Sequence, residues 1–187
     1  MKRGTGKKIG KIVLLVVLLA MVGVIVYAVM VCPVNPTRMK PAKSYEQLRD
    51  TVEKKTDIRV PGEDLLPWTV TERQLRMDSP SRMAKVSGFA ISGAMERGGV
   101  TFNAEVSVGV TGVVGDLPSC WDSYRYVPIY RECSEDGLRL FFVIDGHSYT
   151  YSMGMMAPPQ ETIPQDAMDY FDGLLLAACR EIIDLYS

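Results

Sequence analysis

Histidine is nearly absent from this chain, and the short motifs that carry most known chemistry are missing. The 187 residues include one histidine and four cysteines, and no two cysteines lie two to four positions apart, so the spacing of a zinc site does not occur. There is no GxSxG elbow, no P-loop, no dinucleotide fingerprint and no informative pair of carboxylates. The sequence therefore predicts no cofactor and no metal site, and it favours a non-enzymatic role.

The chain also lacks an excess of positive charge outside its first residues. All 22 acidic residues follow residue 31, together with sixteen of the 21 lysines and arginines, so residues 32–187 carry a net charge of about −6. Binding to phosphates needs a concentrated basic surface. Nucleic acid is therefore not expected as a partner.

One long apolar run is present, at residues 12–31, and a basic start precedes it. At about 1.5 Å per residue, this run would form a helix roughly 30 Å long, the thickness of the hydrocarbon core of a bilayer. The excess of positive charge before it predicts that residues 1–11 form a cytoplasmic basic tail and that residues 12–31 form a single-pass transmembrane helix, a signal-anchor in the cell membrane. The rest of the chain would then lie outside the cytoplasm.

Two other interpretations of this run are weaker. The apolar region of a cleaved signal peptide has about 7–15 residues, whereas this run continues past Ala28, where cleavage would fit. A lipoprotein would need a small residue before Cys32, and Val31 stands there. The uncleaved anchor is favoured, and cleavage stays open.

The chain outside the membrane divides into a spacer and one domain. Residues 32–43 contain three prolines, which disfavour helix and predict a stiff spacer. Residues 44–187 are long enough to bury a core and predict one extracytoplasmic α+β domain.

Helical signals begin and end this domain. Ser44 and Gln47 have the spacing of a capping box, and a short amphipathic helix should follow to about Lys55. A second capping box at Thr162 and Gln165 opens a longer helix. Its buried stripe has spacings of three and four: Met168, Phe171, Leu175, Ala178, Ile182 and Leu185.

Alternation of apolar and polar residues predicts strands between these helices. The strongest strand is Val100–Val110, and we expect it to pair with residues 84–95 so that Met95 faces Val100. A second hairpin spans residues 138–153 around an Asp-Gly turn. A strand at Thr69–Met77 has the mixed polarity of a sheet edge. The prediction is a two-layer α+β domain, an antiparallel sheet packed by a short N-terminal and a longer C-terminal helix.

Three cysteines fall in this domain. Cys120 and Cys133 are the disulfide candidate, because a bridge across their loop would contribute roughly 3 kcal/mol in an oxidising compartment. Two free cysteines in a loop fit the sequence as well. Cys179 lies beside the buried stripe of the last helix and is interpreted as a buried thiol.

The most suggestive segment lies between Cys120 and Cys133. Tyrosine, tryptophan and arginine are the residue types that anchor interfaces, and this segment holds a candidate recognition loop made of Trp121, Tyr124, Arg125, Tyr126 and Tyr130. The alternative is that its aromatic residues belong to the sheet and cover the core.

The single histidine, His147, follows the Asp-Gly turn and is interpreted as an exposed turn residue rather than a catalytic base. The methionines at 153–156 only weakly suggest a soft-metal site, and a strand end explains them better.

These features predict a membrane-anchored extracytoplasmic protein that acts as an interaction or sensing module with an envelope protein partner. The alternatives are an envelope enzyme or small-ligand binder that uses a cavity between sheet and helix, and a structural subunit of a membrane assembly.

Overall fold

The structure is a computed structural model, and it describes residues 16–27, 38–79, 84–110, 119–134, 137–155 and 165–187. Residues 39–78 and 86–187 form one compact unit, which is the domain discussed below.

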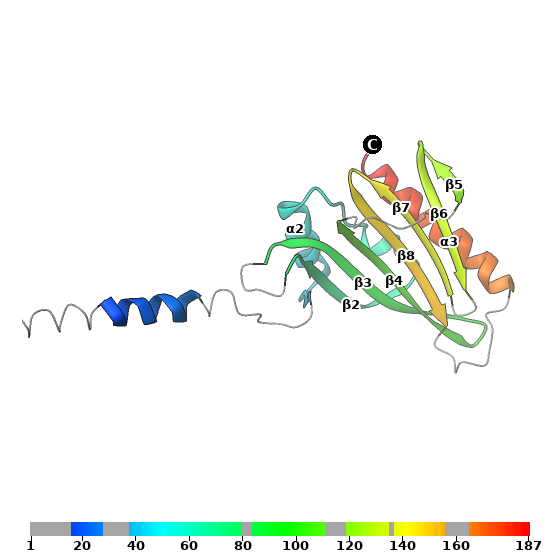
Figure 1. The fold of residues 1–187 in the computed structure, drawn as a ribbon. Helices are drawn as coiled ribbons and strands as arrows, with labels where there is room; N and C mark the ends of the chain where they lie inside the picture. Colours follow the sequence, from blue (N-terminus) through cyan, green and yellow to red (C-terminus); the bar gives the residue numbers. More distant parts are fainter. Residues whose placement is uncertain (1–15, 28–37, 80–83, 111–118, 135–136, 156–164) are drawn as a thin grey trace, which may run out of the picture. The chain divides into compact units, whose positions relative to one another are not determined.

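The domain is built on one antiparallel sheet. In chain order, its elements are β1 (Met39–Pro41), α2 (Tyr45–Lys55), the 3-10 turn η1 (Glu63–Leu65), β2 (Thr69–Met77), β3 (Val86–Arg97), β4 (Val100–Val110), β5 (Cys120–Tyr124), β6 (Val127–Ser134), β7 (Gly137–Ile144), β8 (His147–Met155) and α3 (Gln165–Asp184). The eight strands lie in the order β1-β2-β3-β4-β8-β7-β6-β5 (Figure 1). The short β1 and the hairpin strand β5 are therefore the two edges.

Helices α2 and α3 cover one face of this sheet and share a single hydrophobic core with it. One row of this core runs across five adjacent strands, from β3 to β6, through Phe89, Val108, Tyr149, Phe142 and Ile129. All five side chains are fully buried. The two-layer α+β prediction is confirmed for the domain.

Helix α2 begins where the sequence predicts. The hydroxyl of Ser44 accepts a hydrogen bond from the Gln47 backbone N–H at 3.1 Å, which satisfies one free donor of the first turn. Tyr45, Leu48 and Val52 are buried on one face. The predicted N-cap and the predicted buried face are confirmed. The capping box differs in its second bond, because the Gln47 side chain accepts from the Lys43 N–H at 2.7 Å and not from that of Ser44.

The β3–β4 hairpin differs from its predicted register by two residues. Met95 pairs with Phe102, and Arg97 pairs with Val100. The turn itself is Gly98–Gly99, where both residues have positive φ. Because the shift is even, the predicted inward and outward faces of both strands are kept.

Two details of the predicted sheet are wrong or incomplete. Strand β2 is not an edge, because β1 pairs with it and Lys40 lies opposite Leu75. Residues 39–41 belong to the interval predicted as spacer, so the sheet begins inside it. The rest of the predicted spacer up to residue 37, and Thr162 of the second capping box, lie outside the described residues.

The core between the sheet and α3 is filled by large side chains. Phe102, Phe142, Phe171 and Leu175 are each at most 1% exposed. The rings of Phe102 and Phe171 meet edge to face, with centroids 4.6 Å apart. The C-terminal helix is therefore held by direct contact with the sheet.

The predicted apolar run is described in part. Residues 16–27 are helical, whereas the basic tail 1–11 and the two ends of the run lie outside the described residues. Across the described ranges, no helix combines the length and the apolar character that crossing a membrane would require. A transmembrane helix over residues 12–31 therefore stays a prediction.

Candidate functional site

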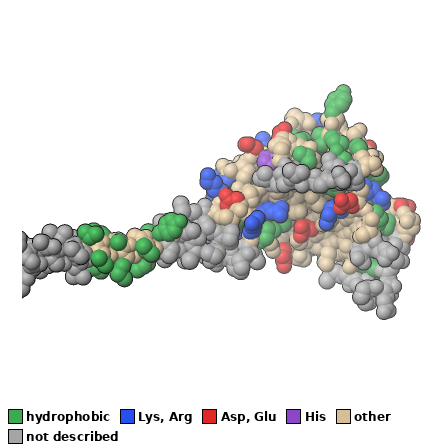
Figure 2. Space-filling model, in the orientation of Figure 1, with side chains coloured by type: hydrophobic (Ala, Val, Ile, Leu, Met, Phe, Trp, Pro, Cys, Tyr) green, Lys and Arg blue, Asp and Glu red, His purple; other side chains and the backbone are tan. Residues whose placement is uncertain are grey.

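The segment predicted as a recognition loop is a β-hairpin at the edge of the sheet. Strands β5 and β6 pair antiparallel, and Tyr124 lies opposite Val127, so only Arg125 and Tyr126 form the turn. Tyr126 is completely exposed. Figure 2 shows hydrophobic atoms standing out of the surface at the top of the view, where Figure 1 places the end of this hairpin.

This turn has an unusual backbone for its sequence. Arg125 and Tyr126 have φ values of 48° and 66°. Two positive φ values in a two-residue turn are typical of type I′, which favours Asn-Gly, because side chains with a Cβ are strained there. The other two-residue turns of the described sheet are Gly98–Gly99 and Asp145–Gly146, and each contains glycine. The β5–β6 turn thus carries two large side chains at positions where the backbone conformation favours glycine.

The hairpin is fixed to α3 by three ion pairs. Arg131 makes two hydrogen bonds of 2.8 Å to the Asp172 carboxylate. Two further pairs complete this clamp, each at 2.9 Å: Arg180 with Asp122, and Arg125 with Asp184. Residues 172, 180 and 184 are spaced by eight and four and therefore share one face of the helix. We refer to these six residues as the hairpin clamp.

Aromatic rings lie among the charges of the clamp. The Arg131 guanidinium lies 5.6 Å from the centroid of Trp121, which is 42% exposed. The Tyr124 hydroxyl donates to Asp184 at 3.3 Å. These contacts place Trp121 and Tyr124 on the side of the hairpin that faces α3.

The other predicted recognition residues are separated from this side. Tyr130 stacks on Phe141 with ring centroids 5.2 Å apart. Its strand neighbours Ile129 and Arg131 face the core and α3, so Tyr130 lies on the opposite face of the sheet. Trp121, Tyr124 and Arg125 therefore lie together on the side of the hairpin that contacts α3. Tyr126 lies apart from them at the tip, and Tyr130 packs within the sheet.

The two cysteines of the disulfide candidate are free thiols in this structure. Cys120 lies opposite Tyr130, and Cys133 lies opposite Leu138 on the next strand pair. They are thus displaced by three residues along the hairpin, roughly 10 Å, beyond the range of a disulfide. Hydrogen bonds and the hairpin clamp order this segment instead. Cys179 is fully buried, as expected, and burial raises the pKa of its thiol well above its usual range.

The acidic and basic partners on α3 are residues of this candidate site that sequence reasoning missed. Asp172, Arg180 and Asp184 were part of a helix interpreted only through its buried stripe. Their regular spacing beside that stripe was a usable signal for a contact. Nothing in the sequence, however, indicated which strand would lie opposite.

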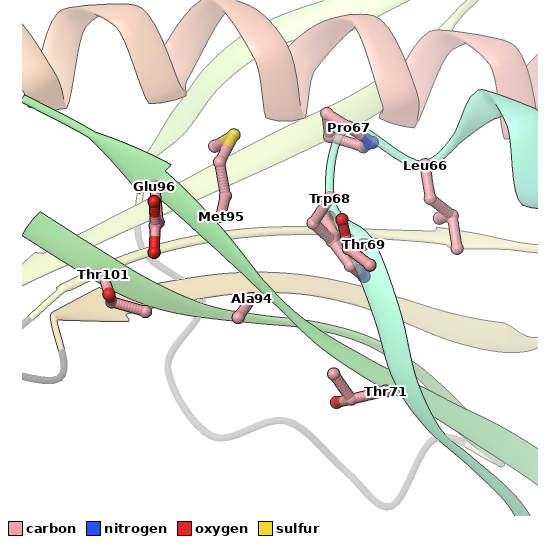
Figure 3. Close-up of a pocket in the computed structure, with 9 residues that line it drawn as sticks. All are labelled: Leu66, Pro67, Trp68, Thr69, Thr71, Ala94, Met95, Glu96 and Thr101. Carbon is pink, nitrogen blue, oxygen red and sulfur yellow. The ribbon is translucent and has the colours of Figure 1, made fainter. Parts of the chain in front are cut away.

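A shallow pocket of about 610 Å³ lies where β2 separates from β3. Pro67 and Trp68 lie on one side of it, and Met95 and Glu96 lie on the other (Figure 3). The indole N–H of Trp68 is buried and has no hydrogen-bond partner. The pocket is open, and its polar groups do not converge on one point.

A tyrosine cluster joins the last turn of the chain to the core. The hydroxyls of Tyr149 and Tyr186 are 2.7 Å apart, and that of Tyr149 also donates to the Arg59 carbonyl at 2.8 Å. Burial, and then the hydrogen bond to Tyr186, raise the pKa of Tyr149 far above its usual value. This cluster stabilises the fold, because its hydroxyls form hydrogen bonds with other groups of the chain.

His147 is half-buried at the start of β8 rather than exposed. Within the described part of the chain, no group of three or more His, Cys, Asp or Glu side chains could hold a metal ion. Comparison with protein-family models, curated proteins and solved structures finds no match to this chain.

Proposed function

We propose that this chain is a membrane-tethered extracytoplasmic interaction module, and that the tip of the β5–β6 hairpin contacts an envelope protein partner. The apolar run is the tether, and the α+β domain is the recognising part. The observation that carries the proposal is Tyr126, a wholly exposed aromatic side chain on a strained turn.

A strained, non-glycine turn costs of order 1 kcal/mol or more per residue, and such strain is concentrated at functional sites. The energetic cost of the strained backbone at Tyr126 is not offset by packing within the chain, because the side chain is wholly exposed to solvent. The clamp holds the turn in place through Arg125 and Asp184. A rigid aromatic tip of this kind loses little conformational entropy on binding, and tyrosine is enriched among the residues that dominate interfaces.

The tether is supported by composition and exposure. The described helical residues 16–27 expose large apolar side chains, with Val24 at 67% and Leu19 at 64%. Apolar surface of this extent is stable only when covered by lipid or protein. Basic residues before the run favour a cytoplasmic N-terminus.

An alternative role as a small-ligand binder with a cavity between sheet and helix has less support. The large side chains of Phe102, Phe142, Phe171 and Leu175 fill that position of the core. A pocket of about 480 Å³ does lie between sheet and helix, but it is an open one at the β3–β4 turn, lined by Phe102 and by Ala167 in the first turn of α3 among others. The pocket beside Trp68 is open as well.

Photocrosslinking in intact cells tests the recognition part of the proposal. The full chain would carry p-benzoylphenylalanine in place of Tyr126, with the same group in place of Leu65 as the control, since Leu65 is also exposed, at 37%. We expect a reproducible adduct with one envelope protein at position 126 and none at 65. Equal adduct patterns at the two positions would contradict the proposed surface.

The tether is tested separately. Alkaline carbonate extraction should leave the full chain in the membrane fraction, and protease added to spheroplasts should digest the domain without lysis. Recovery of the chain in the soluble fraction, or a domain protected until lysis, would rule out the proposed topology.

A further inference from the structure

The two edges of the described sheet are built differently. At one edge, β1 is three residues long and contains Pro41. The Ala42 N–H donates to the Arg73 carbonyl at 2.9 Å, so the alternation of an antiparallel ladder turns the backbone of Pro41 outward. Proline at that position removes the outward donor, and proline on a short edge strand is a recognised protection against pairing with another chain.

At the other edge, β5 has five residues and a bulge between Cys120 and Asp122, but it contains no proline, so its backbone is open to pairing at Ser123. Tyr124 and Val127 close the two-residue turn and form a hydrogen-bonded pair. The next pair, Ser123 with Pro128, is therefore not hydrogen-bonded, and the N–H and C=O of Ser123 point away from β6. Pro128, which has no N–H, fits this assignment. Ser123 is exposed, and no described strand lies beyond β5.

Among the described residues, the charged side chains that join this hairpin to α3 neutralise one another. The hairpin clamp pairs three arginines with three aspartates, one to one. A docking segment would meet exposed rings and backbone groups, Trp121 and Tyr126 among them, rather than an unpaired charge. Burying a charge against such a surface without a partner is costly.

We infer that the partner docks by adding an extended, uncharged segment as a new strand on the free edge of β5. This inference rests on the proposed function and assigns its binding mode. Backbone hydrogen bonds to Ser123 align the segment, as in other complexes formed by strand addition. Tyr126 and Trp121 cover the side chains of the added strand.

A proline at position 123 tests this mode of docking. In the full chain carrying the crosslinker at position 126, Ser123→Pro removes the outward N–H and leaves the β5–β6 ladder with its bonds. The control is Ser123→Thr, which keeps the N–H and suits a strand. We expect the yield of the partner adduct to fall at least tenfold with proline and to stay within twofold with threonine. Thermal melting of the purified full chain in detergent would verify that both variants fold.

A second measurement does not depend on the proline variant folding. The crosslinker in place of Ser123 should capture the same partner as at position 126, whereas in place of Val143, an exposed residue of β7, it should not. Raising the salt concentration from 0.1 to 0.5 M should change the adduct yield in isolated membranes less than twofold, because exposed charge pairs would be screened and an uncharged segment would not.

The outcomes separate the two proposals. If position 126 gives no specific adduct in any background, the proposed function fails. If that adduct forms but survives Ser123→Pro, is lost at high salt, or is not obtained from position 123, the proposed function stands and the strand addition is overturned. An adduct between two copies of this chain would also overturn it, since the edge would then pair with itself.

Discussion

Arg131 on β6 binds both carboxylate oxygens of Asp172 on α3, each at 2.8 Å. The side chains are 25% and 15% exposed, so the pair is partly shielded from water. The hydrogen bond to Asp172 raises the pKa of Arg131 above its already high value. A bidentate pair of this kind fixes orientation as well as distance. It therefore joins the outermost hairpin to the helix layer.

Removing this pair should loosen the hairpin measurably. We expect Asp172→Ala to lower the free energy of unfolding by about 1–2 kcal/mol, since charged hydrogen bonds that are partly buried contribute more than surface pairs. The melting temperature would fall by roughly 2–4 °C per kcal/mol. The matched control is Glu132→Ala, which removes an exposed pair with Arg139 and should change stability by less than about 0.5 kcal/mol. Equal effects from the two variants would contradict a special role for Arg131 and Asp172.

The strained turn predicts a variant that is more stable but binds less. Tyr126→Gly relieves the positive φ, so we expect a gain of about 0.5–1 kcal/mol after the entropy cost of glycine. No packing is lost, because the tyrosine is wholly exposed. Urea unfolding of the full chain in detergent measures the gain. Tyr126→Ala retains a Cβ and should show none. A loss of stability with glycine would mean that the turn is not strained.

Periodic patterns in the sequence were sufficient for most of the fold. Strand β4 has the predicted bounds, and the buried face of α3 contains the predicted stripe up to Ile182. Leu185 was wrongly placed in that stripe, because the helix ends at Asp184 and Leu185 is 42% exposed. The β3–β4 register was wrong by two residues, because an even slip keeps every side chain on its face and alternation cannot detect it. The chain turns at Gly98 and Gly99, which adopt the positive φ values that a tight two-residue turn favours.

The candidate site was less predictable than the fold. The aromatic and arginine composition drew attention to the segment between Cys120 and Cys133, and its role in recognition stays a prediction. Its strands were not predicted, because β5 is short and β6 contains Pro128. The contacts that order it join residues 41 to 59 positions apart, such as Arg125 with Asp184. Pairings of this range depend on the folded topology, and a single sequence does not record them.

Two glycines with opposite surroundings test the packing of the sheet. A Cβ on Gly93 would overlap the Thr69 carbonyl oxygen and the Trp68 ring, and the carbonyl is backbone that cannot move away easily. We expect Gly93→Ala to destabilise the domain by about 2–4 kcal/mol, through overpacking beside a core tryptophan.

The control for this change lies inside α3. A Cβ on Gly173 would meet nothing within 4 Å, and alanine favours helix over glycine by about 1 kcal/mol. Gly173→Ala should therefore stabilise the domain by roughly 0.5–1 kcal/mol. Denaturant unfolding of both variants is the measurement. If both shifted the midpoint in the same direction, the described packing of one of the two sites would be incorrect.

Stability should fall at alkaline pH because of the buried tyrosines. Burial raises the pKa values of Tyr45, Tyr149 and Tyr151 in the folded chain. In the unfolded chain these groups ionise near pH 10. Below that pH their contribution is fully present, and above it the unfolded chain loses protons that the folded chain keeps. The free energy of unfolding should then fall by about 1.4 kcal/mol per pH unit for each such group.

A single variant isolates one of these groups. Tyr149→Phe should cost about 1–3 kcal/mol at neutral pH, because the Arg59 carbonyl loses its buried partner. Above pH 10, the free energy of unfolding of this variant should fall less steeply with pH than that of the unchanged chain. The difference should be about 1.4 kcal/mol per pH unit, because one tyrosine fewer ionises on unfolding. Urea unfolding between pH 7.5 and 11 measures both values. Parallel declines in the two proteins would show that Tyr149 ionises alike in both states.

The thiols of the hairpin give a direct test of its register. Cys120 and Cys133 are exposed and free, and Cys179 is buried with a raised pKa. Because the thiolate is the reactive form, iodoacetamide should label the first two in the native protein, and Cys179 only after unfolding. Peptide mapping by mass spectrometry, without reductant, distinguishes the three positions. If Cys120 and Cys133 both resist labelling until a reductant is added, they form a bridge, and the hairpin has a different register from the one described.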